Sequence, residues 1–196
     1  MRQAKTDRRS LRTRQMLMAA MVELMRQKRY DSITVQEIAD QANIGRSTFY
    51  AHFTDKDDLL VDGVHRMLAS LDTGAPEPIN RGQGRLYPTL ALFDHIGAQS
   101  DLYRVMARGR ALTLFLAALQ DRLATVFTDR LAARVVAGDS PAVPPPLLAA
   151  MVASMLITTL RSWIEDGAAT PAEAVDRMFH TAAGPAIRAG LRPARA

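Results

Sequence analysis

The sequence predicts an all-α protein of about nine helices. Apolar residues recur at three- and four-residue steps in one segment after another, which is the period of a helix with one buried face. Capping residues, glycines and prolines stand between these segments, where helices begin and end. No alternating run of apolar and polar residues is long enough to indicate a strand. Apolar residues make up 48% of the 196-residue chain, so it can bury a substantial core.

The first predicted helix covers about residues 8–28 and has a strongly cationic first half. Its inner stripe consists of apolar residues at helical spacing, namely Leu17, Ala20, Met21 and Leu24. Its first half is crowded with arginines, namely Arg8, Arg9, Arg12 and Arg14. Cations at a helix N-terminus oppose the helix dipole, so phosphate binding is a reason to keep them there.

Two short helical patterns joined by a tight turn come next. Thr34 and Glu37 have the spacing of a capping box, which opens the first of the two helices. Asn43 is a residue type that adopts the left-handed conformation at a helix end. The second helix is expected over residues 46–53. Its inner face is expected to hold Phe49 and Phe53. This is the pattern of a helix-turn-helix, whose second helix enters a DNA major groove.

The rest of the chain predicts six further helices. They are expected at about residues 55–71, 86–98, 101–107, 110–137, 147–166 and 171–190. Thr54 and Asp57 form a pair that resembles a capping box at the start of the first of these. Thr170 and Pro171 have the order of an N-cap and a first-turn proline before the last. Residues 72–84 contain three Gly and two Pro and predict a loop.

The helix-turn-helix segment also resembles the TetR family of bacterial transcriptional regulators. The residues in step with the family's signature are Thr34, Val35, Ile38, Ala39, Ala42, Ile44, Thr48, Phe49, Tyr50, His52, Phe53, Lys56, Leu59 and Leu60. Asn43 and Ser47 stand where glycine is usual, and Gly45 stands where serine is usual. The resemblance covers about a quarter of the chain. It implies an N-terminal three-helix DNA-binding domain at residues 1–53 and a C-terminal helical domain for effector binding and dimerisation at residues 54–196.

Eight residues are predicted to contact DNA. Arg46 is the strongest candidate to read a base, because its guanidinium can bond O6 and N7 of guanine together. Ser47 and Thr48 are short and are expected at bases or nearby phosphates. By resemblance, Gln36 stands at a position of base contact. Also by resemblance, positions that hold the DNA backbone are matched by Thr34, Tyr50, His52 and Lys56.

Each polar candidate also has a plainer explanation. Thr34 can be a helix cap alone, and the two roles are compatible. Thr48 can pack under the turn. His52, taken outside the motif, is an ordinary polar histidine, and the same holds for Tyr50.

The charge distribution supports a nucleic-acid partner. Residues 1–56 contain 11 Lys and Arg against 6 Asp and Glu, whereas residues 57–196 contain 14 of each. All of the net charge of +5 therefore lies in the segment with the motif. A solvated basic face is the alternative, and the helix-turn-helix favours DNA.

The C-terminal helices predict a homodimer. Residues 147–166 are apolar on nearly every side, and one monomer of this size can hardly cover every face of such a helix. With the last helix they are expected to form a dimer interface over about residues 147–190, as a four-helix bundle across a two-fold axis. The family resemblance implies the same interface. Two recognition helices related by symmetry would read a palindrome.

By resemblance, the middle helices, about residues 55–137, enclose a pocket for a small-molecule effector. The candidate ligand contacts are His95, Tyr103, Met106, Phe115 and Trp163, although a core position explains each of them better. Three further cations, Arg104, Arg108 and Arg110, would suit an acidic effector or a solvated face.

The expected function is therefore that of a DNA-binding transcriptional regulator, a dimeric repressor released from a palindromic operator by a small-molecule effector. Repression is the usual habit of the family. An enzyme is the first alternative, but the sequence has no catalytic triad order, no phosphate loop and no metal-ligand spacing, so neither a cofactor nor a metal is expected. A structural DNA-bound protein is the second, and it would not need the long C-terminal part.

The N-terminus lacks the apolar core of a signal peptide, so a cytoplasmic location is expected. The longest apolar run, Leu147 to Leu160, has 14 residues and contains Ser154, Thr158 and Thr159, which favours a buried helix over a membrane span.

Overall fold

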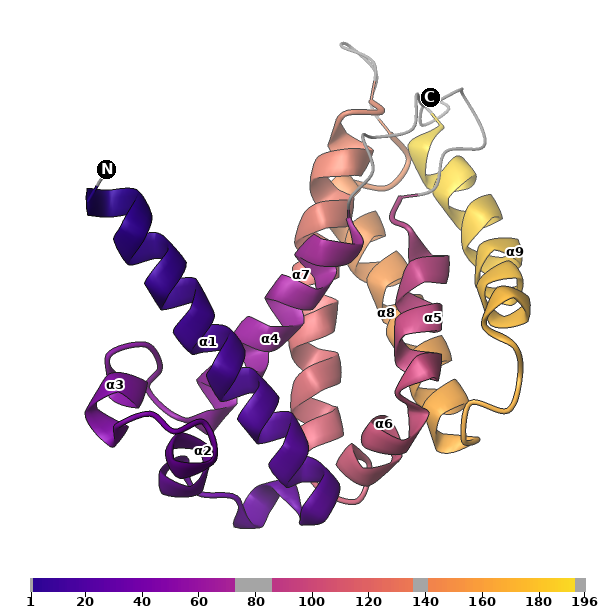
Figure 1. Cartoon of the computed structure of the whole chain (residues 1–196). Coiled ribbons are helices and arrows are strands. Elements are labelled where there is room, and N and C mark those ends of the chain that lie inside the picture. The colour runs from indigo at the N-terminus through magenta and orange to yellow at the C-terminus, as the bar shows by residue number, and fades with distance from the viewer. Residues whose placement is uncertain (1, 73–85, 136–140, 193–196) are drawn as a thin grey trace. The chain divides into compact units, whose positions relative to one another are not determined.

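The computed structural model of the chain describes residues 2–72, 86–135 and 141–192, with side chains from residue 8 onward. Over these ranges the fold is entirely helical, with nine α-helices and one 3-10 turn (Figure 1), which confirms the predicted fold class. The elements are α1 (Arg2–Gln27), η1 (Tyr30–Ser32), α2 (Val35–Gln41), α3 (Arg46–Tyr50), α4 (Lys56–Leu71), α5 (Thr89–Ala98), α6 (Ser100–Met106), α7 (Ala111–Ala132), α8 (Pro145–Glu165) and α9 (Ala172–Leu191).

Several helix boundaries differ from the sequence prediction. α1 begins at Arg2 and not near residue 8, α5 begins at Thr89 and not near residue 86, and α7 ends at Ala132 and not near residue 137. α3 ends at Tyr50, so the predicted helix over residues 46–53 is too long by one turn. α4 is capped by Asp55, whose Oδ1 accepts from the backbone N–H groups of Asp57 and Asp58 at 2.8 and 2.9 Å. The predicted capping pair of Thr54 and Asp57 is therefore wrong. The N-cap of α9 is Pro171, whereas the sequence predicts Thr170 as the N-cap and Pro171 in the first turn. Most of the predicted loop at 72–84 lies outside the described residues.

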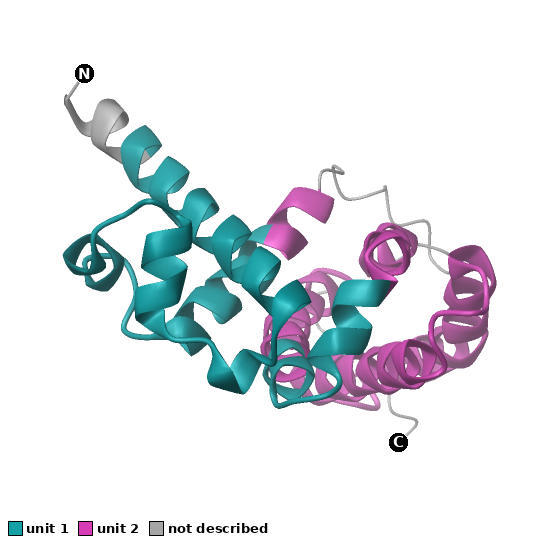
Figure 2. Ribbon diagram, turned by 60° about the horizontal axis from the view of Figure 1, so that its bottom comes forward, with its two compact units in different colours: residues 1–66, 101–115 teal, residues 67–100, 116–196 magenta. Residues whose placement is uncertain are grey.

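The chain divides into two compact units (Figure 2). Unit 1 contains residues 1–66 and 101–115, and unit 2 contains residues 67–100 and 116–196. Unit 1 therefore combines the helix-turn-helix segment with α6 and the first turn of α7. The division into a DNA-binding domain at 1–53 and a C-terminal domain at 54–196 stays a prediction about function.

Unit 1 is built around the inner face of α1. α1 packs on α2, and α2 packs on α3. The buried side chains come from α1, α2, α3 and the segment that leads into α4, and include Leu17, Met21, Ile38, Phe49 and Phe53. This core fixes the orientation of α3 relative to α2 without using the polar side chains of α3.

Unit 2 packs α5 and α8 against α9 (Figure 1). The ring of Trp163 on α8 meets that of Phe93 on α5 edge to face, with centroids 5.5 Å apart. Thr89 and Asp176 are buried polar residues that join α5 to α9, because the hydroxyl of Thr89 donates to Oδ1 of Asp176 at 2.5 Å. Nε2 of His180 lies 2.8 Å from the same hydroxyl.

α8 is the helix that the sequence predicts to be buried on all sides. Within one chain, only one side is covered. Its buried residues are Leu148, Ala149, Val152, Ala153, Leu156, Ile157, Leu160, Trp163 and Ile164. Its other side leaves Leu147 and Met151 exposed by 54% and 52%.

Two helices, α7 and α8, are long and apolar enough to cross a membrane by length and composition alone. Each is about half buried within the folded chain, as core helices are. This makes them weak evidence for a membrane span.

Candidate nucleic-acid interface

The start of α2 is fixed by the predicted capping box. The hydroxyl of Thr34 accepts from the backbone N–H of Glu37 at 3.2 Å, and the carboxylate of Glu37 accepts from the backbone N–H of Thr34 at 2.9 Å. Lys28 donates to the other carboxylate oxygen of Glu37. The Thr34 hydroxyl also donates to Oε2 of Glu37 at 2.9 Å. The bond from Lys28 and the bonds from the backbone N–H and the hydroxyl of Thr34 to the carboxylate lower the pKa of Glu37 from 4.5 to about 2. Thr34 stays exposed, and its hydroxyl both accepts from and donates to Glu37.

Gln36 is exposed on α2, and its amide is held by a neighbour. Nε2 of Gln36 donates to Oδ1 of Asp40, one turn later, at 2.7 Å. This bond directs the carbonyl oxygen and the second amide proton of Gln36 away from Asp40. The side chain is therefore partly oriented before any DNA is present.

The turn between α2 and α3 has the geometry that the sequence predicts. Asn43 has a φ of 53°, the left-handed conformation that asparagine tolerates. The backbone N–H of Ile44 bonds the carbonyl of Ala39 at 2.9 Å, which closes the end of α2. α3 then begins after Gly45, which provides no side-chain cap.

α3 has one buried side chain and four exposed ones. Phe49 is fully buried. The exposed residues of α3 are Arg46, Ser47, Thr48 and Tyr50. The exposure of Thr48 argues against a packing role under the turn. The four residues that the sequence predicts for base and phosphate contact on this helix are therefore all exposed.

Arg46 and Tyr50 form a pair on that surface. The guanidinium carbon of Arg46 lies over the Tyr50 ring, 5.4 Å from its centroid. Nη2 of Arg46 donates to the Tyr50 hydroxyl at 3.3 Å.

His52 lies beyond α3, in the turn that follows it. Its side chain is half-buried and its ring centroid is 6.3 Å from that of Phe53.

Lys56 has a different environment from the one that the sequence predicts. Its ammonium donates to the carbonyls of Tyr30, Asp31 and Ile33 at 2.8, 3.1 and 2.7 Å. An ammonium has three protons, so these bonds commit all of them to the loop before α2. Burial lowers the pKa of Lys56. In this geometry the side chain holds protein backbone and has no proton left for a phosphate.

The cations of α1 divide into two groups. Nη1 of Arg14 pairs with Asp62 at 2.8 Å, and the guanidinium of Arg14 lies over the Phe53 ring, so it ties α1 to α4 and to the segment before it. Arg8, Arg9 and Arg12 are exposed. Exposed arginines on one helix suit the phosphate backbone of DNA. None of these three exposed arginines is among the eight DNA contacts that the sequence predicts.

The five predicted effector contacts fall in different units. Tyr103, Met106 and Phe115 are buried in unit 1, where the rings of Tyr103 and Phe115 meet at 5.0 Å between centroids. His95 and Trp163 belong to unit 2. Nε1 of Trp163 donates to the carbonyl of Thr170 at 2.8 Å, so its polar atom is satisfied within the fold. Burial lowers the pKa of His95.

Comparisons with known proteins agree with this geometry. Residues 17–62 match the model of the family described as bacterial regulatory proteins, tetR family. The chain is 38% identical over 66 residues to YxbF, an HTH-type transcriptional regulator of Bacillus subtilis, and the match covers 33% of this chain and 17% of that protein.

Two solved structures share the fold of nearly the whole chain. A TetR-family regulator from Syntrophomonas wolfei has a TM-score of 0.65 at 20% identity, with 90% of this chain and 95% of that one covered. FadR from Bacillus subtilis, solved in complex with stearoyl-CoA, has a TM-score of 0.54 at 16% identity, with 88% and 98% covered.

A short helix with exposed polar residues, packed on a capped partner helix through a tight turn, defines a helix-turn-helix DNA-binding protein. The family model and the relative make the class specific. Residues 17–62 carry the DNA-binding domain of the TetR family of bacterial transcriptional regulators, and the fold of the chain is that of a solved TetR-family regulator.

Proposed function

We propose that the chain is a homodimeric repressor that reads a palindromic operator with α3 and is released from it by a small-molecule effector. The observation that carries the proposal is the exposed surface of α3, where Arg46 projects beside Ser47, Thr48 and Tyr50 while Phe49 anchors the helix. An arginine at the start of a recognition helix suits guanine, whose O6 and N7 it can bond together. Gln36, oriented by Asp40, supplies a second base contact from α2.

Phosphate contacts fix the register of a recognition helix and carry no sequence information of their own. Tyr50 and His52 are the proposed contacts next to α3. Thr34, at the start of α2, would contact a phosphate by redirecting its hydroxyl proton from Glu37. Arg8, Arg9 and Arg12 add cations from α1, and they take the role that the sequence assigned to Lys56. We propose instead that Lys56 fixes the shape of the loop before α2, because its ammonium donates to three backbone carbonyls of that loop.

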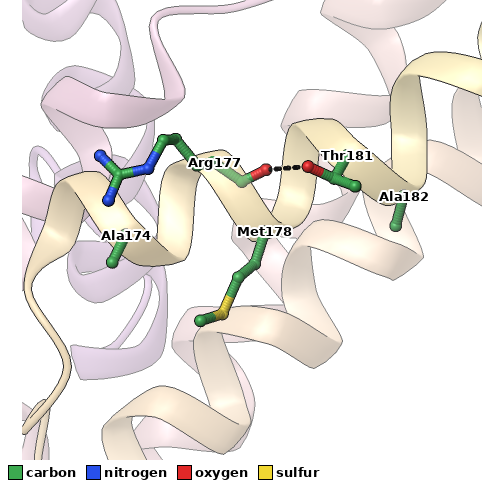
Figure 3. Close-up of a pocket in the computed structure, with 5 residues that line it drawn as sticks. All are labelled: Ala174, Arg177, Met178, Thr181 and Ala182. Carbon is green, nitrogen blue, oxygen red and sulfur yellow. Dashed lines mark hydrogen bonds between the residues drawn. The ribbon is translucent and has the colours of Figure 1, made fainter.

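The dimer interface is proposed on the outer sides of α8 and α9. α8 leaves a stripe that one chain does not cover, formed by Leu147, Met151, Ser154 and Thr158. On α9, the exposed residues are mostly small or apolar, and Met178 is exposed by 62%. A shallow hollow of about 530 Å³ on α9 is lined by Ala174, Arg177, Met178, Thr181 and Ala182 (Figure 3). Small side chains allow helices to approach closely, as a four-helix bundle between two copies requires.

The effector is proposed to be lipophilic. The middle helices contain buried apolar and aromatic side chains, including those of Tyr103, Met106 and Phe115 in unit 1. A protein of the same fold, FadR, is known in complex with stearoyl-CoA. An effector releases DNA only if it binds the DNA-free conformation better, and the coupling between the two ligands is reciprocal. A DNA target also places the protein in the cytoplasm.

Selection from a random duplex library with the purified full chain tests the proposal. We expect an inverted repeat whose half-sites lie one or more DNA turns apart, bound by two copies of the chain. A library that yields no enriched sequence at physiological salt would contradict sequence-specific recognition.

A further inference from the structure

The turn between α6 and α7 reaches the loop that precedes α2. Nη2 of Arg110, the residue before α7, donates to both carboxylate oxygens of Asp57 at 2.8 and 2.6 Å. Nε of the same guanidinium lies 3.3 Å from Oδ1 of Asp31. Asp31 belongs to η1 and Asp57 to the first turn of α4, so one side chain joins these two elements. All three residues lie in unit 1.

Tyr30 and Lys56 complete this cluster. The Tyr30 side chain is buried, and its hydroxyl donates to Asp57 at 2.6 Å. Nζ of Lys56 and the guanidinium carbon of Arg110 lie 4.7 and 5.8 Å from the centre of the Tyr30 ring. Lys56 thus holds the backbone of the loop before α2. Asp57 holds the side chain of Tyr30, and Arg110 holds that of Asp31.

The electrostatics of the cluster agree with its geometry. Burial and the bond to Asp57 raise the pKa of Tyr30, so its hydroxyl stays a donor. The hydrogen bond to Asp57 and its charge raise the pKa of Arg110. Two cations, Lys56 and Arg110, thus stand among two carboxylates, those of Asp31 and Asp57.

The backbone next to Arg110 also comes close to the loop. A Cβ atom added at Gly109 would lie 2.9 Å from Oδ2 of Asp31, which is too close without a shift. The close atom is the end of the Asp31 side chain, so a side chain at position 109 would require the carboxylate that Arg110 holds to shift.

We propose that Arg110 is a positioning residue for DNA recognition, which sets the placement of α2 and α3 by fixing η1 against the start of α4. Thr34 follows Asp31 by three residues, so the loop that Arg110 holds leads directly into the start of α2. α3 packs on α2, so its placement depends on that of α2. The inference rests on the proposed function, because it assigns Arg110 a part in the reading of the operator by α3. It replaces both sequence-based readings of Arg110, the effector contact and the solvated charge.

A positioning role differs from a purely stabilising one. The side chain of Arg110 is exposed by 57%, and those of its partners Asp31 and Asp57 by 40% and 29%. Ion pairs with so exposed a cation contribute little to stability. Recognition, in contrast, needs side chains held within a fraction of an ångström of their contacts. Loss of Arg110 should therefore affect operator affinity more than folding.

The test compares Arg110→Ala with Arg108→Ala, which removes the same charge from an exposed arginine two residues away. Affinity is measured by fluorescence anisotropy on the selected operator and on a random duplex over a range of salt. We expect Arg110→Ala to lose roughly tenfold on the operator and less than about twofold on random DNA, with the salt slope unchanged. Arg110→Lys should recover part of the loss, and Arg108→Ala should behave as wild type.

A second variant makes the test independent of folding. Asp31→Asn should reproduce part of the loss on the operator, and the double variant with Arg110→Ala should lose less than the sum of the single losses, because both remove one contact. If circular dichroism shows that Arg110→Ala does not fold, Asp31→Asn alone decides, and wild-type operator affinity in it would overturn the proposal.

Other results would overturn it as well. Equal operator affinity for Arg110→Ala and Arg108→Ala would leave the cluster without a role in recognition. Equal losses on both duplexes with a shallower salt slope would make Arg110 a phosphate contact. Failure of the wild-type chain to select any sequence is a separate result, which removes the proposed function and this inference with it.

Discussion

Arg46 lies over the ring of Tyr50, one turn later on α3, and donates a hydrogen bond to its hydroxyl. Both side chains are exposed, and Tyr50 leaves 47% of its surface uncovered. The ring restricts the conformations of a long side chain that would otherwise be free. A side chain that is already ordered loses less conformational entropy when it binds, so Tyr50 prepares Arg46 for its contact with a base.

Tyr50→Ala removes the ring beneath Arg46. We expect it to weaken operator binding by about 0.5–1 kcal/mol, the usual value of an exposed cation–π contact. Tyr50→Phe keeps the ring and should retain most of the affinity. Anisotropy titrations on the operator separate the two variants. Equal losses would mean that the hydroxyl, through a phosphate contact, is the important group.

Arg12 and Lys56 are expected to respond differently to salt. Arg12→Ala should lower the slope of log K against log salt by about 1, because one phosphate contact is lost. Lys56→Met should leave the slope unchanged and instead destabilise the fold by about 1–3 kcal/mol, since three carbonyls lose their donor. Salt titrations and urea unfolding measure the two effects. A reduced slope for Lys56→Met would restore Lys56 as a phosphate contact.

The exposed side of α9 should be sensitive to charge without loss of the fold. Met178→Glu and Ala182→Glu would place a carboxylate in the proposed interface, where burial of an unpaired charge costs several kcal/mol. We expect folded monomers with weak operator binding, measured by light scattering and circular dichroism. Leu156→Glu is the contrasting variant, because Leu156 is fully buried within one chain and its loss should unfold the protein. Folded dimers of Met178→Glu and Ala182→Glu would place the interface elsewhere.

Glu37 should link stability to acid pH. Its pKa in the folded chain, about 2, is lower than its ordinary value of 4.5, so its contribution is present above about pH 4.5 and is lost as the pH falls towards 2. Glu37→Gln cannot ionise. The gap in melting temperature between wild type and Glu37→Gln should therefore be widest near neutral pH and close between pH 4.5 and 2. A gap that is constant over this range would mean that the charge of Glu37 has no part in stability.

A lipophilic effector should raise the melting temperature and lower operator affinity together. Typical allosteric couplings of about 1–3 kcal/mol would weaken operator binding roughly 5- to 150-fold. Saturating operator should weaken the effector by the same factor. The screen uses lipophilic metabolites, including acyl-CoA thioesters, in a thermal-shift assay. A compound that stabilises the fold and leaves operator affinity unchanged would argue against the release mechanism.

The helix-turn-helix could be predicted from sequence because its signals are local. The capping box at Thr34 and Glu37 and the left-handed Asn43 involve residues at most three apart, and both are present as predicted. Arg46 is exposed for an equally local reason, since Phe49 takes the buried face of α3. In contrast, the predicted end of α3 at residue 53 is wrong, because the helix ends at Tyr50 and the chain turns at Ala51 to bury Phe53.

The cluster around Arg110 could not be predicted. Its partners, Asp31 and Asp57, are separated from it by more than fifty residues, and no periodic pattern connects them. The environment of Lys56 has the same origin, because its three acceptors are backbone carbonyls, which every residue has. The bonds between Gln36 and Asp40 and between Arg46 and Tyr50, each at four-residue spacing on one helix, offered sequence signals that were missed.

The most direct test of DNA reading by α3 is a base-by-base specificity profile of wild type and Arg46→Ala. Each base pair of the selected operator is replaced in turn, and the affinity of both proteins is measured for every duplex. We expect Arg46→Ala to lose about 1–3 kcal/mol on the operator and to lose discrimination at one G·C pair in each half-site, at positions related by the two-fold axis. An unchanged profile for Arg46→Ala, or a change in one half-site only, would contradict symmetric readout through Arg46.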